Sequence, residues 1–403
     1  MIPTLEDIKG AQRRLSGIIS PSPLTYSGAF SRMFGADIFL KLENLQETGS
    51  FKVRGAYNRL LNLSDDEKKK GVIAASAGNH AQGVASASNR LGVRATIVMP
   101  EDVPLKKLLA VKDYGAEVIL FGTRYNDAFD HAREISQQTG RTLIPGFDDP
   151  YIIAGQGTIG LEIANLLEGD VAVLAAIGGG GLISGIAAAV KELYPPARVI
   201  GVQTKACPST IRSLGEGRHV TVDVGQTIAD GIAVNRPGDL NFSMIQKYVD
   251  DVVGVEEEDI AGAVLNLLEK ANIIAEGAGA APLAALMEPH HTLKAERYIL
   301  IVSGGNIEVS TIDRILHRGS IKMGRLMQIE VNILDAPGSL WHLLGIIARE
   351  KANILHISHD RLDPQNSIEM SRVTLNLEIR GHEHGRELIE KLTDAGYNVK
   401  QIR

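Results

Sequence analysis

The stretch VAVLAAIGGGGLISGIAAAVKEL, residues 171–193, decides the fold class of this 403-residue chain. Its first part, 171–177, is apolar without interruption, four glycines follow at 178–181, and the remainder has helical spacing. A strand that is apolar along its whole length is typical of a parallel sheet covered on both faces. The stretch therefore predicts an α/β unit in which a buried strand leads through a glycine-rich loop into a helix.

The same alternation of short apolar runs and longer helical patterns recurs from about residue 37 to residue 330. It predicts strands at 71–76, 94–100, 116–122, 142–147, 171–177, 198–203 and 298–305. We expect two parallel sheets in one catalytic domain, residues 1–325. The smaller sheet occupies about 40–146, and the larger sheet is formed by the N-terminal segment with about 147–320.

The pattern changes at residue 326, where a different order of elements begins. We predict a strand at 326–334, a turn at 335–338 and a helix at 340–351, then strands at 353–360 and 369–379, a helix at 383–395 and a strand at 397–402. This βαββαβ order is ferredoxin-like. Residues 326–403 are therefore expected to form a small separate domain.

Composition excludes several classes of function. With 44% hydrophobic residues, 22% charged residues and a net charge of −6, the chain is close to an average globular protein. This balance gives no reason to expect nucleic-acid or membrane binding. The N-terminal residues lack a signal peptide pattern, no stretch has the length of an apolar span, and the one cysteine fits a reducing compartment. We expect a cytoplasmic protein.

No metal site is predicted from the sequence. The histidine clusters at 290–291 and 382–384 lack a third ligand at a useful spacing, and the single cysteine excludes a cysteine-rich site. Solvated surface is the favoured interpretation of both clusters.

The glycines of the opening stretch are candidates for anion binding. Gly178, Gly179, Gly180 and Gly181 would expose backbone N–H groups at a helix N-terminus, a combination that most often binds phosphate. The loop is neither a Walker motif, because no Gly-Lys-Ser/Thr follows, nor a dinucleotide fingerprint, because its third glycine is missing. A phosphate other than that of ATP or NAD is therefore indicated, with a flexible turn as the alternative.

Two further loops follow predicted strands. SAGNHAQG, 76–83, could hold a carboxylate on free N–H groups, although Asn79 could equally be a turn residue and His80 is more often structural than a catalytic base. VSGGN, 302–306, ends another strand. Ligands bind at the carboxyl ends of strands in open α/β sheets. One shared site is therefore the best explanation for polar loops at the ends of several strands.

Lys52 lies in ETGSFKVRGAYNRLL, residues 47–61, after turn residues and before a helical pattern. On its own the stretch favours an ordinary surface lysine. The positive end of a helix disfavours a cation, however, so the same position would favour a neutral, nucleophilic amine. Combined with a phosphate loop and a carboxylate loop, this lysine indicates pyridoxal phosphate and an amino-acid substrate.

With these residues in place, the sequence resembles the tryptophan-synthase-like pyridoxal-phosphate enzymes, and within them the threonine dehydratases, or threonine ammonia-lyases. The resemblance covers nearly the whole chain. It is carried by ENLQETGSFKVRGA (43–56), SAGNHAQG (76–83), GGGGL (178–182), ADGIAV (229–234), EGAGA (276–280) and SGGN (303–306).

The resemblance implies roles for individual residues. Lys52 would be bonded to the cofactor, Phe51 would pack beside its ring, and Asn79 would bind its 3-oxygen. The phosphate would be bound by Gly178, Gly179, Gly180, Gly181 and Leu182. Ser303 would face the pyridine nitrogen, while Ser76, Asn79 and His80 would form the loop for the substrate carboxylate. Glu276 is placed near the site.

The implied reaction converts threonine to 2-oxobutanoate and ammonia, with the freed Lys52 amine acting as a base at Cα. A serine at the pyridine nitrogen makes the ring a weaker electron sink, which favours elimination. Val53 differs from the aspartate that synthases of this fold carry there. Gln203 and Ser209 differ from the metal ligands of related racemases. Serine remains a second substrate, because one methyl group gives a discrimination of only about 1–3 kcal/mol.

The C-terminal unit resembles an ACT regulatory domain, because DAPGSL (335–340) matches the D-x-P-G-x-L turn of such domains. The resemblance implies an amino-acid effector, with isoleucine or valine expected, at Asp335, Pro337, Gly338 and Leu340. A packing module without a ligand is the alternative. A homodimer or homotetramer is expected. Serine dehydratase, serine racemase and a non-catalytic amino-acid sensor remain alternative functions, and the sequence leaves open whether the product feeds isoleucine biosynthesis or catabolism.

Overall fold

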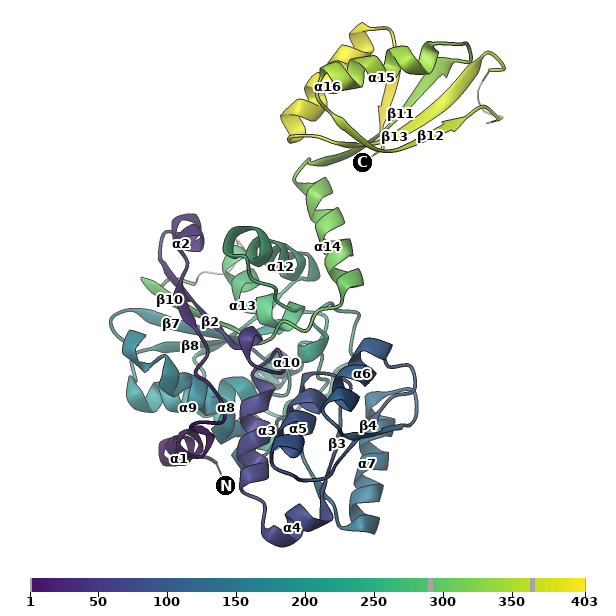
Figure 1. Ribbon diagram of the computed structural model, residues 1–403. Helices are drawn as coiled ribbons and strands as arrows, with labels where there is room; N and C mark the ends of the chain where they lie inside the picture. Colours follow the sequence, from purple (N-terminus) through teal and green to yellow (C-terminus); the bar gives the residue numbers. More distant parts are fainter. Residues whose placement is uncertain (1, 289–292, 363–366, 403) are drawn as a thin grey trace. The chain divides into compact units, whose positions relative to one another are not determined.

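The computed structural model describes residues 2–288, 293–362 and 367–402. The chain forms two compact units, residues 1–307 and 308–403 (Figure 1). The expected boundary at 325/326 falls between a helix, α14 (Val309–Lys322), and the first strand of the C-terminal sheet, β11 (Leu326–Leu334). Helix α14 groups with the C-terminal unit.

The first unit contains a larger, mixed sheet. Its strands are β1 (Leu24–Tyr26), β2 (Asp37–Leu42), β7 (Val171–Ala176), β8 (Arg198–Thr204), β9 (Asp251–Val255) and β10 (Arg297–Val302). They lie in the order β1-β2-β10-β7-β8-β9. All neighbours are parallel except β1, which pairs antiparallel with β2. Every residue of β7 is buried, which explains the unbroken apolar run of the opening stretch.

A smaller, fully parallel sheet lies in the same unit. It consists of β3 (Val72–Ala75), β4 (Ala95–Met99), β5 (Glu117–Leu120) and β6 (Thr142–Leu143), in the order β5-β4-β3-β6. The two parallel-sheet regions that the sequence predicts are therefore confirmed. Strand β6 is much shorter than the predicted 142–147, because its last residues leave the sheet and enter a loop.

Helices connect these strands and cover the sheets. In the first unit they are α1 (Leu5–Leu15), α2 (Gly28–Phe34), α3 (Lys52–Leu61), α4 (Asp65–Lys70), α5 (Asn79–Arg90), α6 (Leu105–Asp113), α7 (Tyr125–Thr139), α8 (Pro150–Glu162), α9 (Gly181–Leu193), α10 (Ser209–Glu216), α11 (Asp239–Tyr248), α12 (Glu257–Ala271) and α13 (Gly277–Met287).

Helix α8 has an ordinary N-terminal cap. The Asp149 side chain accepts hydrogen bonds from the second and third N–H groups of α8, and Pro150 occupies the first helical position.

Both sheets have helices on two faces. Figure 1 shows α8 and α9 on one face of the larger sheet and α12 and α13 on the other. In the smaller sheet, residues of α3, α5 and α6 share a core with β3 and β4, whereas α7 packs into a separate apolar cluster with the same strands. This arrangement leaves the carboxyl ends of the strands for loops.

The strand predictions missed three members of the larger sheet. Strand β1 is short, β2 begins with an aspartate and contains a lysine, and β9 is an edge strand with one fully buried residue, Val255. None of these has the unbroken apolar run that marked the other strands. The expectation of a purely parallel sheet is corrected by β1, which runs antiparallel at the edge.

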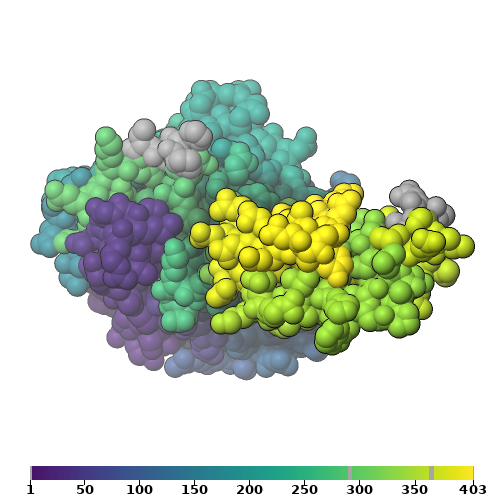
Figure 2. Space-filling view, turned by 90° about the horizontal axis from the view of Figure 1, so that it is seen from above, coloured from purple at the N-terminus to yellow at the C-terminus, as the bar shows by residue number. Residues whose placement is uncertain are grey.

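The C-terminal unit has the predicted βαββαβ order. After β11 come α15 (Ser339–Arg349), β12 (Asn353–Asp360), β13 (Met370–Glu378), α16 (His382–Asp394) and β14 (Asn398–Gln401). The sheet is antiparallel in the order β12-β13-β11-β14. Apolar residues on one face of β11 and β13 pack against α15 and α16. Figure 2 looks onto this helical face, with α16 in yellow.

Candidate active site

The lysine-bearing stretch is fixed to the exit of β10. Ser50 and Gly304 form an isolated antiparallel bridge, and the N–H of Gly305 donates to the carbonyl of Gly49 at 2.9 Å. The N–H of Phe51 donates to the carbonyl of Ser303 at 3.0 Å. The structure thus brings Phe51 and Ser303, which the sequence places 252 positions apart, into direct contact.

Lys52 is the first residue of α3, and its amine is held inside the protein. Its Nζ donates to the carbonyl of Gly146 at 2.7 Å and lies 5.3 Å from the centre of the Phe51 ring. Burial lowers the pKa of Lys52 to about 8, while the negative charge of Glu276 acts in the opposite direction. The lowered pKa agrees with the expectation of a reactive amine, but its main cause is lost hydration rather than the helix dipole.

The glycine loop after β7 is a cradle of free N–H groups. Within the described part of the chain, nothing accepts a hydrogen bond from the N–H groups of Gly178 through Ile183. Gly180 has φ +98°, and residues 179–183 are buried. Buried N–H groups without an acceptor are costly, and these lie at the positive end of a 13-residue helix. The loop therefore fits a bound phosphate.

Phe147 closes one side of this loop. A Cβ on Gly179 would lie 2.4 Å from the Phe147 ring, and one on Gly181 would lie 2.9 Å from the Phe147 carbonyl oxygen. Only glycine permits this close packing. The loop after β6 therefore contacts both Lys52, through Gly146, and the phosphate cradle, through Phe147.

The loop after β3 provides a second set of free donors. Ser76 Oγ accepts from the N–H of Gly78 at 3.2 Å, which shapes the turn into α5. Among the residues that the structure describes, none accepts from the N–H groups of Asn79, His80 or Ala81. These N–H groups lie at the start of a 12-residue helix, on one half-buried residue (Asn79) and two buried ones (His80 and Ala81), and they fit a carboxylate.

His80 is buried and neutral. Its Nε2 donates to the carbonyl of Ile144 at 2.9 Å, because a carbonyl oxygen can only accept. Burial and, to a smaller extent, the nearby Lys52 charge lower its pKa to about 4. A histidine of this kind supports the loop and is a poor base at neutral pH, so the structure favours the structural interpretation of His80.

Glu276 lies at the start of α13, buried beside the lysine. Its carboxylate accepts from Nδ2 of Asn79 at 2.8 Å, and its N–H donates to the carbonyl of Gly304 at 3.0 Å. Burial and, to a smaller extent, the Asp230 carboxylate raise the pKa of Glu276 to about 7. The expectation that Glu276 lies near the site agrees with these contacts.

Sequence reasoning missed Gly146, Phe147 and Asn306 as parts of the site. The first two end the segment TLIPGF, which was interpreted only as a strand. Asn306 closes SGGN, and its Nδ2 donates to Asn79 Oδ1 at 2.7 Å and to the carbonyl of Thr48 at 2.8 Å. The position of Gly146 and Phe147 directly after a strand of the same sheet was the sequence signal that could have placed them in the site.

Gln203 and Ser209 lie side by side and bind each other. Gln203 Nε2 donates to Ser209 Oγ at 3.3 Å, and Gln203 Oε1 accepts from the N–H groups of Thr210 and Ile211 at the start of α10. The side-chain amide of Gln203 therefore caps the N-terminus of α10. Outside 289–292 and 363–366, no group of three or more His, Cys, Asp or Glu side chains is arranged to hold a metal ion. The pair at 290–291 lies outside the described residues.

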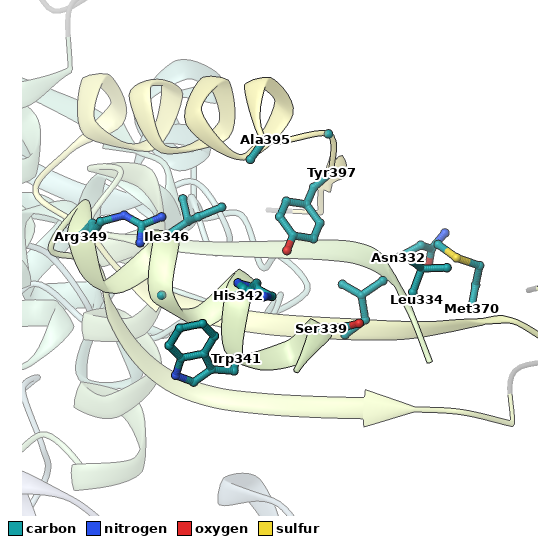
Figure 3. A pocket seen from close by; sticks show the side chains of 13 residues that line it. Asn332, Leu334, Ser339, Trp341, His342, Ile346, Arg349, Met370, Ala395 and Tyr397 are labelled. Atoms are coloured by element: carbon teal, nitrogen blue, oxygen red, sulfur yellow. The ribbon is translucent and has the colours of Figure 1, made fainter. Parts of the chain in front are cut away.

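Of the predicted effector residues, Asp335, Pro337 and Gly338 lie in the turn between β11 and α15, and Leu340 lies in the first turn of α15. Asp335 pairs with Arg361 at 3.0 Å, and Gly338 has φ +91° directly before the helix. A surface pocket of about 560 Å³ adjoins this turn, but Asp335, Pro337, Gly338 and Leu340 do not line it. Figure 3 shows its labelled residues, with Trp341, His342 and Arg349 on α15 and Tyr397 facing them after α16.

Comparisons with known proteins agree with this geometry. The pyridoxal-phosphate dependent enzyme family matches residues 15–304, and the chain belongs to this family. It is 48% identical over 399 residues to L-threonine ammonia-lyase of Thermotoga maritima, covering 99% of both chains. Its cofactor is therefore pyridoxal phosphate. No helix in the described ranges is long and apolar enough to cross a membrane.

Two solved structures share the fold. Threonine deaminase isoform 2 of Solanum lycopersicum has a TM-score of 0.75 and 38% identity, covering 79% of this chain and 91% of that chain. Maize serine racemase has a TM-score of 0.74 and 32% identity, covering 80% and 99%. Similarity to two different activities means that the reaction has to be argued from the site.

Proposed function

We propose that the chain is a pyridoxal-phosphate dependent lyase that converts L-threonine to 2-oxobutanoate and ammonia, and L-serine to pyruvate and ammonia. The observation that carries the proposal is the position of Lys52. Its amine, with the pKa lowered to about 8, lies in the same unit as two helix N-termini whose N–H groups have no acceptor among the described residues. The relative named L-threonine ammonia-lyase covers 99% of the chain and supports this substrate.

The residues divide the work. The N–H groups of Gly178 to Leu182 hold the cofactor phosphate, Phe51 packs on the ring and Ser303 faces the pyridine nitrogen. Asn79 binds the 3-oxygen. The N–H groups around Ser76, Asn79 and His80 orient the substrate carboxylate. When bound, the cofactor withdraws electrons from the substrate Cα.

Lys52 is the proposed base at Cα. A neutral amine is available at moderate pH because burial disfavours its charged form. Gly146 keeps the amine oriented through the hydrogen bond from Nζ. Neutral His80, bonded through Nε2 to the Ile144 carbonyl, does not compete for the proton.

Steady-state oxo-acid formation tests this function. The purified protein should be yellow and should form 2-oxobutanoate from threonine and pyruvate from serine. Lys52→Ala should lose the absorbance band and the activity, whereas Lys191→Ala, on a surface ion pair with Asp250, should retain both. A protein that stays colourless after incubation with pyridoxal phosphate contradicts the proposal.

Serine racemase is the second candidate, because maize serine racemase shares the fold over 80% of the chain. The observation against it is the hydrogen bond between Gln203 and Ser209, the two positions where the family resemblance implies metal-binding carboxylates in racemases. Chiral analysis of serine after incubation, with and without Mg²⁺, separates the two. Formation of D-serine faster than pyruvate would favour the racemase.

We further propose that residues 326–403 form an ACT regulatory domain, joined to a catalytic domain at 1–325. The ferredoxin-like order β12-β13-β11-β14 and the turn at 335–340 support this. Isoleucine or valine is the proposed effector, with its carboxylate at the N-terminus of α15 beside Gly338. Regulation by isoleucine would suit an enzyme that feeds isoleucine biosynthesis. We propose a homodimer or homotetramer, which light scattering measures.

The regulatory proposal has its own experiment. Threonine deamination is measured with and without isoleucine or valine, in the whole chain and after deletion of 326–403. The whole chain should respond and the shortened chain should not. An unchanged response after deletion contradicts regulation through this domain.

A further inference from the structure

Four groups form one chain of hydrogen bonds beside the lysine. Asn306 Nδ2 donates to the carbonyl of Thr48 at 2.8 Å and to Oδ1 of Asn79 at 2.7 Å. Asn79 Nδ2 donates in turn to Oε1 of Glu276 at 2.8 Å. The chain links the segment before Lys52, the exit of β10, the start of α5 and the start of α13.

The chain has one direction, which is set at the Thr48 end, where the carbonyl oxygen can only accept. The Thr48 carbonyl requires a donor, so it fixes which end of the Asn306 amide faces it. One Nδ2 hydrogen of Asn306 is donated to the Thr48 carbonyl and the other to Asn79. Asn79 must therefore turn its Oδ1, and not its Nδ2, toward Asn306. Asn79 then turns its Nδ2 toward Glu276, whose Oε1 accepts at 2.8 Å. The Asn79 amide is therefore held in one of its two orientations.

Two glycines make room for the chain. Gly49 has φ +71°, and a Cβ on it would lie 2.5 Å from Oδ1 of Asn306. A Cβ on Gly304 would lie 2.4 Å from Oε1 of Glu276. Gly49 and Gly304 therefore leave space for the side chains of Asn306 and Glu276. Gly304 also forms the backbone bridge with Ser50.

We propose that Asn306 and Glu276 are positioning residues that orient the Asn79 amide toward the 3-oxygen of pyridoxal phosphate. The inference rests on the role of Asn79 in the proposed function. Asn79 Nδ2 uses one hydrogen for Glu276. Its second hydrogen is the one available to the cofactor oxygen, and the two neighbours prevent the amide from turning its oxygen there instead.

The test uses the holoenzyme and does not depend on turnover. In Asn306→Asp, the new carboxylate cannot donate to Thr48 or to Asn79. Asn79 should turn, so the absorption maximum of the bound cofactor should shift and the cofactor should dissociate about tenfold more readily, the effect of losing one hydrogen bond to a charged group. Asn44→Asp is the matched control, because Asn44 also donates to a nearby backbone carbonyl, that of Ile274, at 3.0 Å.

Two variants of Glu276, at the other end of the hydrogen-bond chain, provide a second test that still applies if Asn306→Asp fails to fold. Glu276→Gln retains an oxygen that accepts from Asn79 and should preserve the absorption maximum. Glu276→Leu has no acceptor and should shift it as Asn306→Asp does. An unchanged spectrum and affinity in both Asn306→Asp and Glu276→Leu, or an equal change in Asn44→Asp, would overturn the proposal.

The proposed function can fail separately. If the protein binds the cofactor with a Lys52-dependent band but forms no oxo acid from threonine, the lyase proposal is wrong. The spectra of the Asn306 and Glu276 variants still decide the positioning role.

Discussion

Lys52 Nζ and the carbonyl oxygen of Gly146 lie 2.7 Å apart, joined by a hydrogen bond that the amine donates. A carbonyl oxygen accepts but does not remove a proton, so this contact orients the amine without requiring its charged form. The next residue, Phe147, packs against Gly179. One short loop therefore positions the reactive amine and the phosphate cradle together.

The first prediction concerns the pH dependence of cofactor attachment. Only the neutral amine of Lys52 is nucleophilic, and burial lowers its pKa to about 8. The rate at which cofactor-free protein gains its absorbance band should therefore rise with pH through about 8. Stopped-flow absorbance measures this. A rise centred near the ordinary lysine value of 10.5 would contradict the lowered pKa.

The second prediction concerns the glycine loop. In Gly179→Ala the new Cβ would lie 2.4 Å from the Phe147 ring, so the loop or the ring must move. We expect cofactor affinity to fall at least tenfold, about 1.4 kcal/mol, in an equilibrium titration followed by absorbance. The control is Gly215→Ala, because a Cβ on Gly215 has nothing within 4 Å. Equal affinities in the two variants would contradict the packing argument.

The third prediction concerns a buried charge cluster that anchors α3. Arg54 is 1% exposed, and its guanidinium donates to Glu43 Oε2 at 2.8 Å and to Glu162 Oε2 at 2.9 Å. Arg54→Met leaves two carboxylates without this partner and should lower the free energy of unfolding by about 3–5 kcal/mol. Chemical denaturation measures the change.

Arg212→Met provides the comparison for this cluster. Arg212 pairs with Glu216 on the surface and is 58% exposed, so its loss should change stability by less than about 0.5 kcal/mol. If both arginine variants unfold at the same denaturant concentration as the unaltered protein, the cluster does not stabilise α3.

The fourth prediction concerns the pH dependence of stability. Burial raises the pKa of Glu276 from 4.5 to about 7. The folded state then binds more protons than the unfolded state between these values, so this group costs stability as pH rises through that range. In cofactor-free protein, Glu276→Gln should gain stability relative to the unaltered protein between pH 5 and pH 8, by up to about 3 kcal/mol.

Urea denaturation at several pH values checks this. Glu134→Gln is the control, because the Glu134 side chain is 65% exposed and should show no such pH-dependent gain. Parallel stability curves for Glu276→Gln and the unaltered protein would contradict the raised pKa.

The fold was predictable from sequence wherever strands are buried on both faces. VAVLAAI and GVIAAS contain uninterrupted apolar runs because β7 and β3 have no solvent face. The edge strands β1 and β9 have solvent faces and mixed composition, so pattern alone did not find them. The C-terminal strand β11 was predicted to the residue, since its burial alternates regularly.

The candidate site was predictable only in its loops. Glycines and polar residues after strands drew attention to 76–83, 178–182 and 302–306. Pattern reasoning could not show that Asn306 donates to Asn79, or that Gly146 accepts from Lys52, because both contacts join segments far apart in the chain. The cause of the lowered Lys52 pKa was likewise hidden, since burial is a property of the fold.

The N–H groups from Gly178 to Ile183, which have no acceptor among the described residues, link the stability of this protein to the supply of its cofactor. A ligand that binds only the folded state stabilises it by mass action, by about 2.7 kcal/mol at a hundredfold excess over Kd. A bound phosphate supplies acceptors to these N–H groups. A cell short of pyridoxal phosphate would therefore hold less of this protein, because chains without cofactor unfold and are degraded more often.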